Sequence, residues 1–110
     1  MVNNILNAAG IQQRGSRFTR PPGSVYAVWF DDVTTDGADG MPPCIFTHDV
    51  SIELYEQKPD NAAVAALEAE LTAAGLHWTK EDRFWIASEQ VYQTVYEFTY
   101  TEKRRTLTNG

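Results

Sequence analysis

Residues 48–75, with the sequence HDVSIELYEQKPDNAAVAALEAELTAAG, contain the change of hydrophobic period that decides the fold. Between Cys44 and Gln57 apolar and polar residues alternate, and the apolar positions on one side are Val50, Ile52 and Leu54. This alternation predicts a half-buried strand whose outer face is hydrated. Pro59 interrupts the alternation, and apolar residues then recur at helical spacing.

A helix is expected from Asn61 to Ala74. Asp60 or Asn61 can cap its first turn, and Gly75 stands where the chain would leave the helix. The cap should stabilise the helix by about 1 kcal/mol. The apolar stripe of this helix consists of Val64, Leu67, Leu71 and Ala74.

Further strands are expected on both sides of this unit. The segment from Val25 to Phe30 is apolar on both faces, as a strand covered on both sides would be. After the helix we expect a short strand, the charged turn KEDR, and a second short strand from Phe84 to Ala87. The last strand, from Val91 to Lys103, has strong β propensity. The predicted fold class is therefore α+β, a small antiparallel sheet with one main helix packed on a face, in the order arm-β-β-α-β-β.

The two ends are predicted to lie outside this domain. Residues 1–23 are expected to form an arm, with one or two frayed helical turns at VNNILNAAGIQ and an extended stretch before Pro21 and Pro22. Residues 24–105 would form the single domain, and residues 106–110 a flexible tail. Between the first two strands, the composition of Asp31–Pro43, DDVTTDGADGMPP, predicts a long loop.

The lengths of the predicted elements point to contacts between copies of the chain. Strands of about thirteen residues would run roughly 40 Å, whereas the helix would cover only about 21 Å. One helix cannot cover such a sheet. Either the strands bend and break, or their uncovered parts and the two-faced strand from Val25 to Phe30 meet another subunit.

Charge is segregated along the chain. The first 23 residues contain Arg14, Arg17 and Arg20 but no acidic residue, and the end contains Lys103, Arg104 and Arg105. Residues 24–102 hold three basic and fifteen acidic residues, a net charge of −12. Both basic ends are therefore predicted to contact acidic bodies of neighbouring subunits or partners. The alternative is two solvated, partly disordered ends. The overall charge of −6 argues against a general grip on nucleic-acid phosphates.

No metal or cofactor site is predicted. Asp32, Thr34, Asp36 and Gly37 fit the first half of a calcium-binding EF-hand loop, but Pro43 occupies the position that requires a glutamate. A single Cys44 excludes an internal disulfide and a multi-cysteine zinc site, and it lies too far along the strand from His48 to share an ion with it. His48 is expected to make a backbone contact near a strand end.

Catalysis is not predicted either, because the sequence lacks the GxSxG, GxGxxG and GxxxxGK[ST] motifs. The aromatic stripe of Tyr92, Tyr96, Phe98 and Tyr100 is expected to pack in the core or an interface, since the neighbouring glutamates disfavour stacking with bases. The sequence shows no signal peptide and no stretch long enough to span a membrane, so a soluble intracellular protein is expected.

Four segments, YAVWFDDV, HDVSIELYEQKPD, AALEAELTAAGLHWT and QVYQTVYEFTYTEKR, together resemble the small neck or tail-completion proteins of long-tailed bacteriophages, most closely the tail terminators. The resemblance covers roughly residues 24–105 and rests on the order and texture of the elements. The weak N-terminal helix departs from the family pattern, which leaves open which neck component the chain would be.

This resemblance implies a non-enzymatic virion structural protein, assembled in the host cytoplasm. It would form a ring, typically hexameric, that ends polymerisation of the tail tube and joins the tail to the head. Its partners would be other copies of itself, the tail tube protein and a head-side neck protein, with DNA only passing through the lumen and no membrane contact. The acidic loop, with Asp31, Asp32, Asp36 and Asp39, would then be an axial contact with the tube or head partner.

Two alternatives remain open at this point. A small acidic inhibitor that mimics DNA would have a comparable charge density, and it predicts carboxylates spaced like phosphates on one exposed face. A small-molecule enzyme or binding domain would need a pocket with converging polar groups, for which the sequence offers no candidate set.

Overall fold

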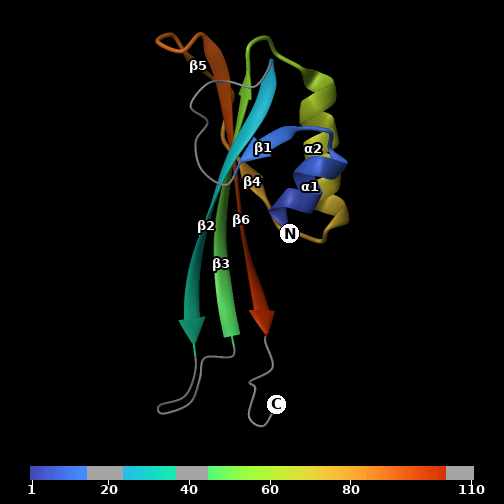
Figure 1. The fold of residues 1–110 in the computed structure, drawn as a ribbon, viewed down its shortest axis with the longest axis vertical. Helices are drawn as coiled ribbons and strands as arrows, with labels where there is room; N and C mark the ends of the chain where they lie inside the picture. Colours follow the sequence, from blue (N-terminus) through green and yellow to red (C-terminus); the bar gives the residue numbers. More distant parts are fainter. Residues whose placement is uncertain (15–23, 37–44, 104–110) are drawn as a thin grey trace.

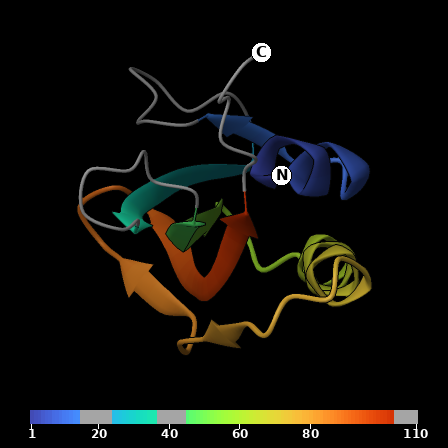
Figure 2. The same cartoon turned by 90° about the horizontal axis from the view of Figure 1, so that it is seen from below.

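The computed structural model describes residues 1–14, 24–36 and 45–103 and confirms the predicted α+β class (Figure 1). The elements are α1 (Val2–Ala8), β1 (Gln12–Arg14), β2 (Val25–Asp36), β3 (Ile45–Glu56), α2 (Asn61–Ala73), β4 (Thr79–Lys80), β5 (Phe84–Ile86) and β6 (Val91–Lys103). Both helices lie on the same side of the sheet (Figure 2).

The centre of the sheet is a set of three long antiparallel strands. The pairing of β2 with β3 runs from Val25 opposite Glu56 to Asp36 opposite Ile45, and β3 pairs with β6 over the same length. β1 pairs in parallel with the edge of β2 that faces away from β3. β4 and β5 pair with different parts of β6. The two short strands predicted around the KEDR turn are therefore present as β4 and β5.

Alternation along the long strands separates a core face, which the helices cover, from an outer face. Val50, Ile52 and Leu54 all lie on the core face and are buried, as the sequence predicts. They pack with Tyr96 and Phe98 of β6 and with the helix residues Leu67 and Leu71. Burying each of these leucines contributes on the order of 2 kcal/mol.

The beginning of the chain belongs to this core and differs from the predicted arm. Val2, Ile5 and Leu6 of α1 are buried, and Ile11 is buried just after the turn at Gly10, whose φ is +75°. Helix propensity is low here, but packing against α2 and the sheet stabilises the helix, as tertiary contacts do for most short helices. The rest of the expected arm lies outside the described residues.

β2 is longer than the sequence predicts. Asp31 to Asp36, expected to begin a loop, continue the strand in unbroken register with β3. Aspartate has a low β propensity, but a backbone ladder with an adjacent strand outweighs that preference. The remainder of the expected loop, including Asp39, lies outside the described residues.

α2 begins as predicted. The Asp60 side chain accepts a hydrogen bond from the Ala63 N–H at 3.0 Å, and the chain leaves the helix at Gly75, whose φ is +76°. The helix ends at Ala73, one residue earlier than expected.

Replacement of Asp60 by alanine is expected to lower the free energy of unfolding by about 1 kcal/mol, because the Ala63 N–H loses its acceptor. Urea denaturation followed by circular dichroism would measure the change. Asp60→Asn is the matched control, since asparagine retains a cap oxygen, and equal losses in the two variants would contradict a capping role.

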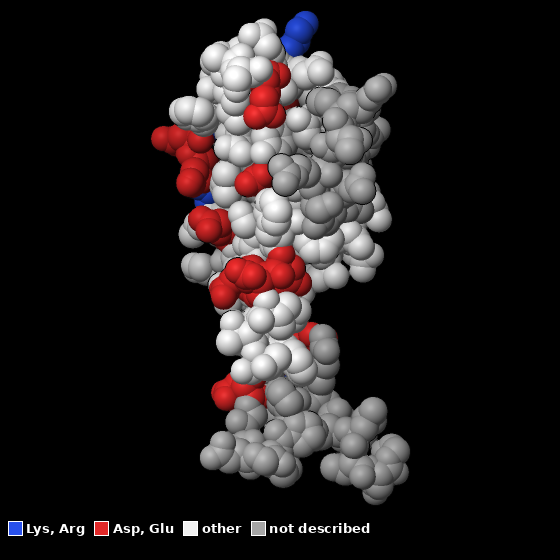
Figure 3. Space-filling model, turned by 60° about the vertical axis from the view of Figure 1, so that its left-hand side comes forward, with Lys and Arg blue, Asp and Glu red and all other residues white. Residues whose placement is uncertain are grey.

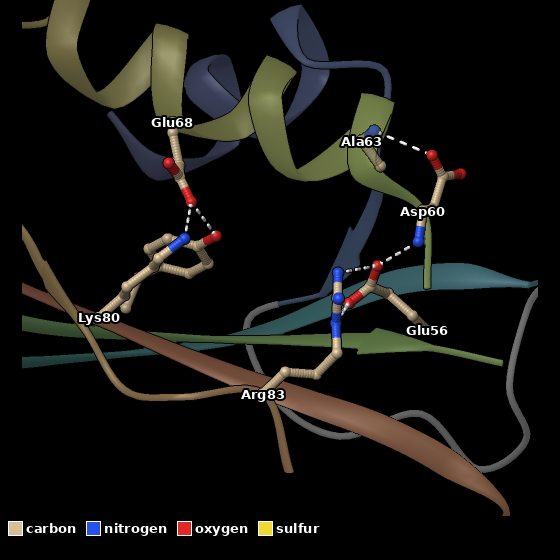
Figure 4. A network of polar contacts seen from close by, with 7 residues as sticks. Glu56, Asp60, Ala63, Glu68, Lys80 and Arg83 are labelled. Atoms are coloured by element: carbon tan, nitrogen blue, oxygen red, sulfur yellow. Dashed lines mark hydrogen bonds and ion pairs between the residues drawn. The ribbon is translucent and has the colours of Figure 1, made fainter. Parts of the chain in front are cut away.

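Two groups of polar contacts, one around Glu56 and one around Glu68, join α2 and its first residues to the sheet and to the β4–β5 region (Figure 4). Glu56, fully buried at the end of β3, accepts hydrogen bonds from Arg83 Nε and Nη2, both at 3.1 Å, and from the Asp60 backbone N–H at 2.6 Å. Glu68 accepts hydrogen bonds from Lys80 Nζ at 2.6 Å and from the Tyr96 hydroxyl at 2.8 Å. Burial alone would raise the pKa of Glu68, but these two hydrogen bonds and the Lys80 charge lower it below its usual value.

The three long strands project beyond the helices, so the molecule measures 52 × 28 × 24 Å (Figure 1). We call the projecting part the extension and define it by register as residues 31–36, 45–50 and 98–103. The predicted mismatch between the strand and helix lengths is thus a feature of the fold.

Candidate interaction surface

The extension has two outer edges without a paired strand among the described residues. β1 pairs with β2 only as far as Val28, so no strand of the described residues pairs with the outer edge of β2 along residues 31–36. β4 and β5 pair with β6 no further than Glu97. No strand of the described residues pairs with that edge of β6 beyond this position. Such edges can pair with strands of another chain.

The outer face of the sheet carries five carboxylates, which are Asp32, Asp36, Asp49, Glu53 and Glu97. Asp32 lies directly opposite Asp49, and like charges in such a pair disfavour the isolated strand pairing. Thr99 Oγ1 donates a hydrogen bond to Asp49 at 2.7 Å. Figure 3 shows acidic side chains spread along this side of the molecule, with few basic ones among the coloured residues.

This face is hollowed into an open concavity of about 1080 Å³. Its lining includes the half-exposed Phe30 and the acidic residues Asp32, Asp49 and Glu97. Thr79 of β4 and the preceding His77 also line it. A surface with an exposed ring among carboxylates is suited to a cationic partner that also presents apolar atoms.

On the core face of the extension, a buried histidine joins all three strands. His48 of β3 lies with Nδ1 at 2.9 and 3.0 Å from the two Asp31 carboxylate oxygens on β2. Its Nε2 lies 3.0 Å from Glu102 Oε1 on β6. The ring stacks on Tyr100, with centroids 4.4 Å apart and planes 5° apart. The expected backbone contact of His48 is thus replaced by a carboxylate on each side of the ring.

The contacts of His48 favour its charged form. Burial lowers the pKa of the ring, but the hydrogen bonds to Asp31 and Glu102, together with their negative charges, raise it above the usual value of 6.5. Ionised carboxylates only accept hydrogen bonds, so both ring nitrogens must carry a proton for both contacts to be hydrogen bonds. This geometry is the one expected of an imidazolium between two carboxylates.

The predicted contact residues are distributed over different parts of the fold. Asp31 points to the core face and Asp32 to the outer face, because neighbouring residues of a strand alternate. Asp36 and Lys103 flank Ile45 in the last row of the extension, and Arg14 is the last residue of β1. Residues outside the described part are Arg17, Arg20, Asp39, Arg104 and Arg105.

Sequence reasoning did not find the roles of His48 and Glu102. Each lies on a predicted strand, but 54 positions separate them, and only the strand register brings them together. The sequence gives one local indication: Glu102 follows the aromatic stripe at an even spacing. In a strand this spacing places Glu102 on the same face as the stripe, which is the core face.

In residues 1–14, 24–36 and 45–103, no group of three or more His, Cys, Asp or Glu side chains is arranged to hold a metal ion. The residues that match the first half of an EF-hand loop do not form such a group. Asp32, Thr34 and Asp36 lie in an extended strand, where their side chains are spaced along one face instead of converging. No helix in the same residues is both long and apolar enough to cross a membrane.

The sequence matches no protein-family model and no curated protein sequence.

Proposed function

We propose that this chain is a non-enzymatic structural protein of the head-tail neck of a long-tailed bacteriophage. Copies of it would form a ring, a homo-hexamer in our proposal, that caps the tail tube and joins it to the head. The observation that carries the proposal is the extension, whose two outer edges have no strand partner in the described part of the chain. Because these edges lie on opposite sides of one sheet, a head-to-tail contact between copies can repeat and close.

Charge supports the same assembly. The acidic outer face would repel DNA phosphates if it lined a lumen, so a genome could pass without binding. In our proposal the basic positions Arg17, Arg20, Arg104 and Arg105 reach acidic faces of neighbouring subunits or of the tube and head partners. Such contacts would weaken with salt, because they form between exposed charges.

The proposal predicts a particle much heavier than one chain at low ionic strength. Light scattering would measure its mass, and electron micrographs recorded with and without tube protein would show rings. Val33→Lys places a charge at an exposed position of the β2 edge and is expected to release monomers. The matched control is Ser88→Lys, which adds the same charge at an exposed site outside the extension. A strict monomer at all concentrations, with no ring even beside tube protein, would remove the proposal.

Removal of the first 23 residues cannot test the role of the basic ends, because it would also remove α1, which is part of the core. Point substitutions and a short C-terminal truncation avoid this. Arg17→Gln with Arg20→Gln, and separately a chain that stops after Lys103, would remove charge and leave every described element in place. We expect both changes to dissociate the particle at lower salt than the unaltered chain, with unchanged circular dichroism.

The five outer-face carboxylates also favour a second candidate function, an acidic inhibitor that mimics DNA. The three long strands present these groups on one face, as this function requires. Competition with DNA for a nuclease or a repressor by a monomeric chain would support this second function, and a ring would count against it.

A further inference from the structure

We propose that His48, when protonated, is a latch that holds the three strands of the extension together, and that loss of its proton loosens the end of β6. This device is separate from the outer face and its carboxylates, because His48 points to the core face. The latch acts within one chain. Only the idea that copies of the chain meet through the extension rests on the proposed function.

The geometry places a single ring between the two outer strands. Nδ1 contacts Asp31 on β2, Nε2 contacts Glu102 on β6, and the ring itself belongs to β3 between them. A neutral imidazole has only one N–H, so it can donate to one of the two carboxylates and must turn a lone pair toward the other. Deprotonation therefore replaces one attractive contact with a repulsive one.

The contact to Glu102 is the one that we expect to open. Nδ1 lies within 3.0 Å of both Asp31 oxygens, but Nε2 reaches only one oxygen of Glu102. The Asp31 side chain is also the more buried carboxylate, with 23% of its surface exposed against 42% for Glu102. A remaining proton on Nδ1 keeps the shielded carboxylate paired, and the more exposed one can turn to water.

Within the described part of the chain, the titratable groups that face His48 are Asp31 from β2, and Tyr100 and Glu102 from β6. Tyr100 stacks on the ring and holds its plane, and a cation above an aromatic face adds to the preference for the protonated form. Tyr100 lies two residues before Glu102 on the same face, so opening of the latch would affect the last residues of β6 together.

The direction of the pH dependence follows from the raised pKa. Below 6.5, the usual value, His48 is protonated in the folded and unfolded chain, and the latch contributes its full stability. As pH rises from there through the folded pKa, this contribution is lost. Each pKa unit of elevation corresponds to about a tenfold change in the equilibrium between closed and open ends.

Two readouts on the full chain test the latch. The sequence has two histidines, so imidazole NMR signals follow both titrations, and His77→Gln assigns them and serves as the control. Amide hydrogen exchange, expressed as protection factors, follows residues 100–103 one pH unit below and one above the His48 midpoint. We expect a midpoint above 6.5 and protection that falls several-fold across it, in the unaltered chain and in His77→Gln alike.

Glu102→Gln is the decisive variant. Its side-chain amide can accept from a protonated ring or donate to a neutral one, so we expect a lower His48 midpoint and no fall in protection across it. A His48 midpoint at or below 6.5, or equal protection on both sides of the midpoint in the unaltered chain, would overturn the latch. Both readouts arise within one chain, so a monomeric protein could pass this test while the ring proposal failed.

Discussion

Replacement of Arg83 by methionine is expected to lower the free energy of unfolding by about 3 kcal/mol, because removal of one partner from a buried ion pair leaves the other charge uncompensated. Glu56 has no exposed surface, and Arg83 supplies two of its three hydrogen bonds. The Asp60 N–H alone cannot replace a guanidinium. Guanidinium chloride denaturation would measure the loss.

The double variant Glu56→Gln with Arg83→Met separates buried charge from lost packing. Glutamine is neutral and can still accept from the Asp60 N–H, so we expect the double variant to recover most of the stability and to lie within about 1 kcal/mol of the unaltered chain. If the double variant were as unstable as Arg83→Met alone, the cost would come from the missing arginine stem and not from the buried carboxylate.

The elements that the sequence predicts well are those whose hydrophobic period is set by burial on one side. β3 alternates because one face covers the core, and Ile52 and Leu54 are fully buried there. The helical stripe of α2 fails only at its end, where the predicted Ala74 is exposed while Leu67 and Leu71 are buried. In both elements local sequence and tertiary environment agree, and the prediction needs no knowledge of distant residues.

Prediction failed where a distant partner decides the structure. Asp31 to Asp36 look like a loop because their composition is that of a turn, but β3 holds them in a strand by its backbone ladder. His48 gives no sign in sequence of the two carboxylates beside it, since they come from strands 17 positions before it and 54 after it. The charge pattern of the sequence likewise does not distinguish Asp31 from Asp32, although the strand directs their side chains to opposite faces of the sheet.

The first residues show most clearly how tertiary contacts override local preference. Leu6 is fully buried in α1, whose sequence VNNILNA is poor in helix formers. We expect Leu6→Ala to lower the free energy of unfolding by about 3 kcal/mol, from lost apolar burial and from the cavity that remains. Chemical denaturation with tryptophan fluorescence would measure this change.

Asn4→Ala provides the control in the same helix, because Asn4 is exposed and alanine is the better helix former. It should leave stability unchanged or raise it by a few tenths of a kcal/mol. The contrast between the two variants distinguishes a helix held by its buried face from a frayed arm. An arm outside the domain would make both substitutions neutral, and that result would return residues 2–11 to the arm that their sequence predicts.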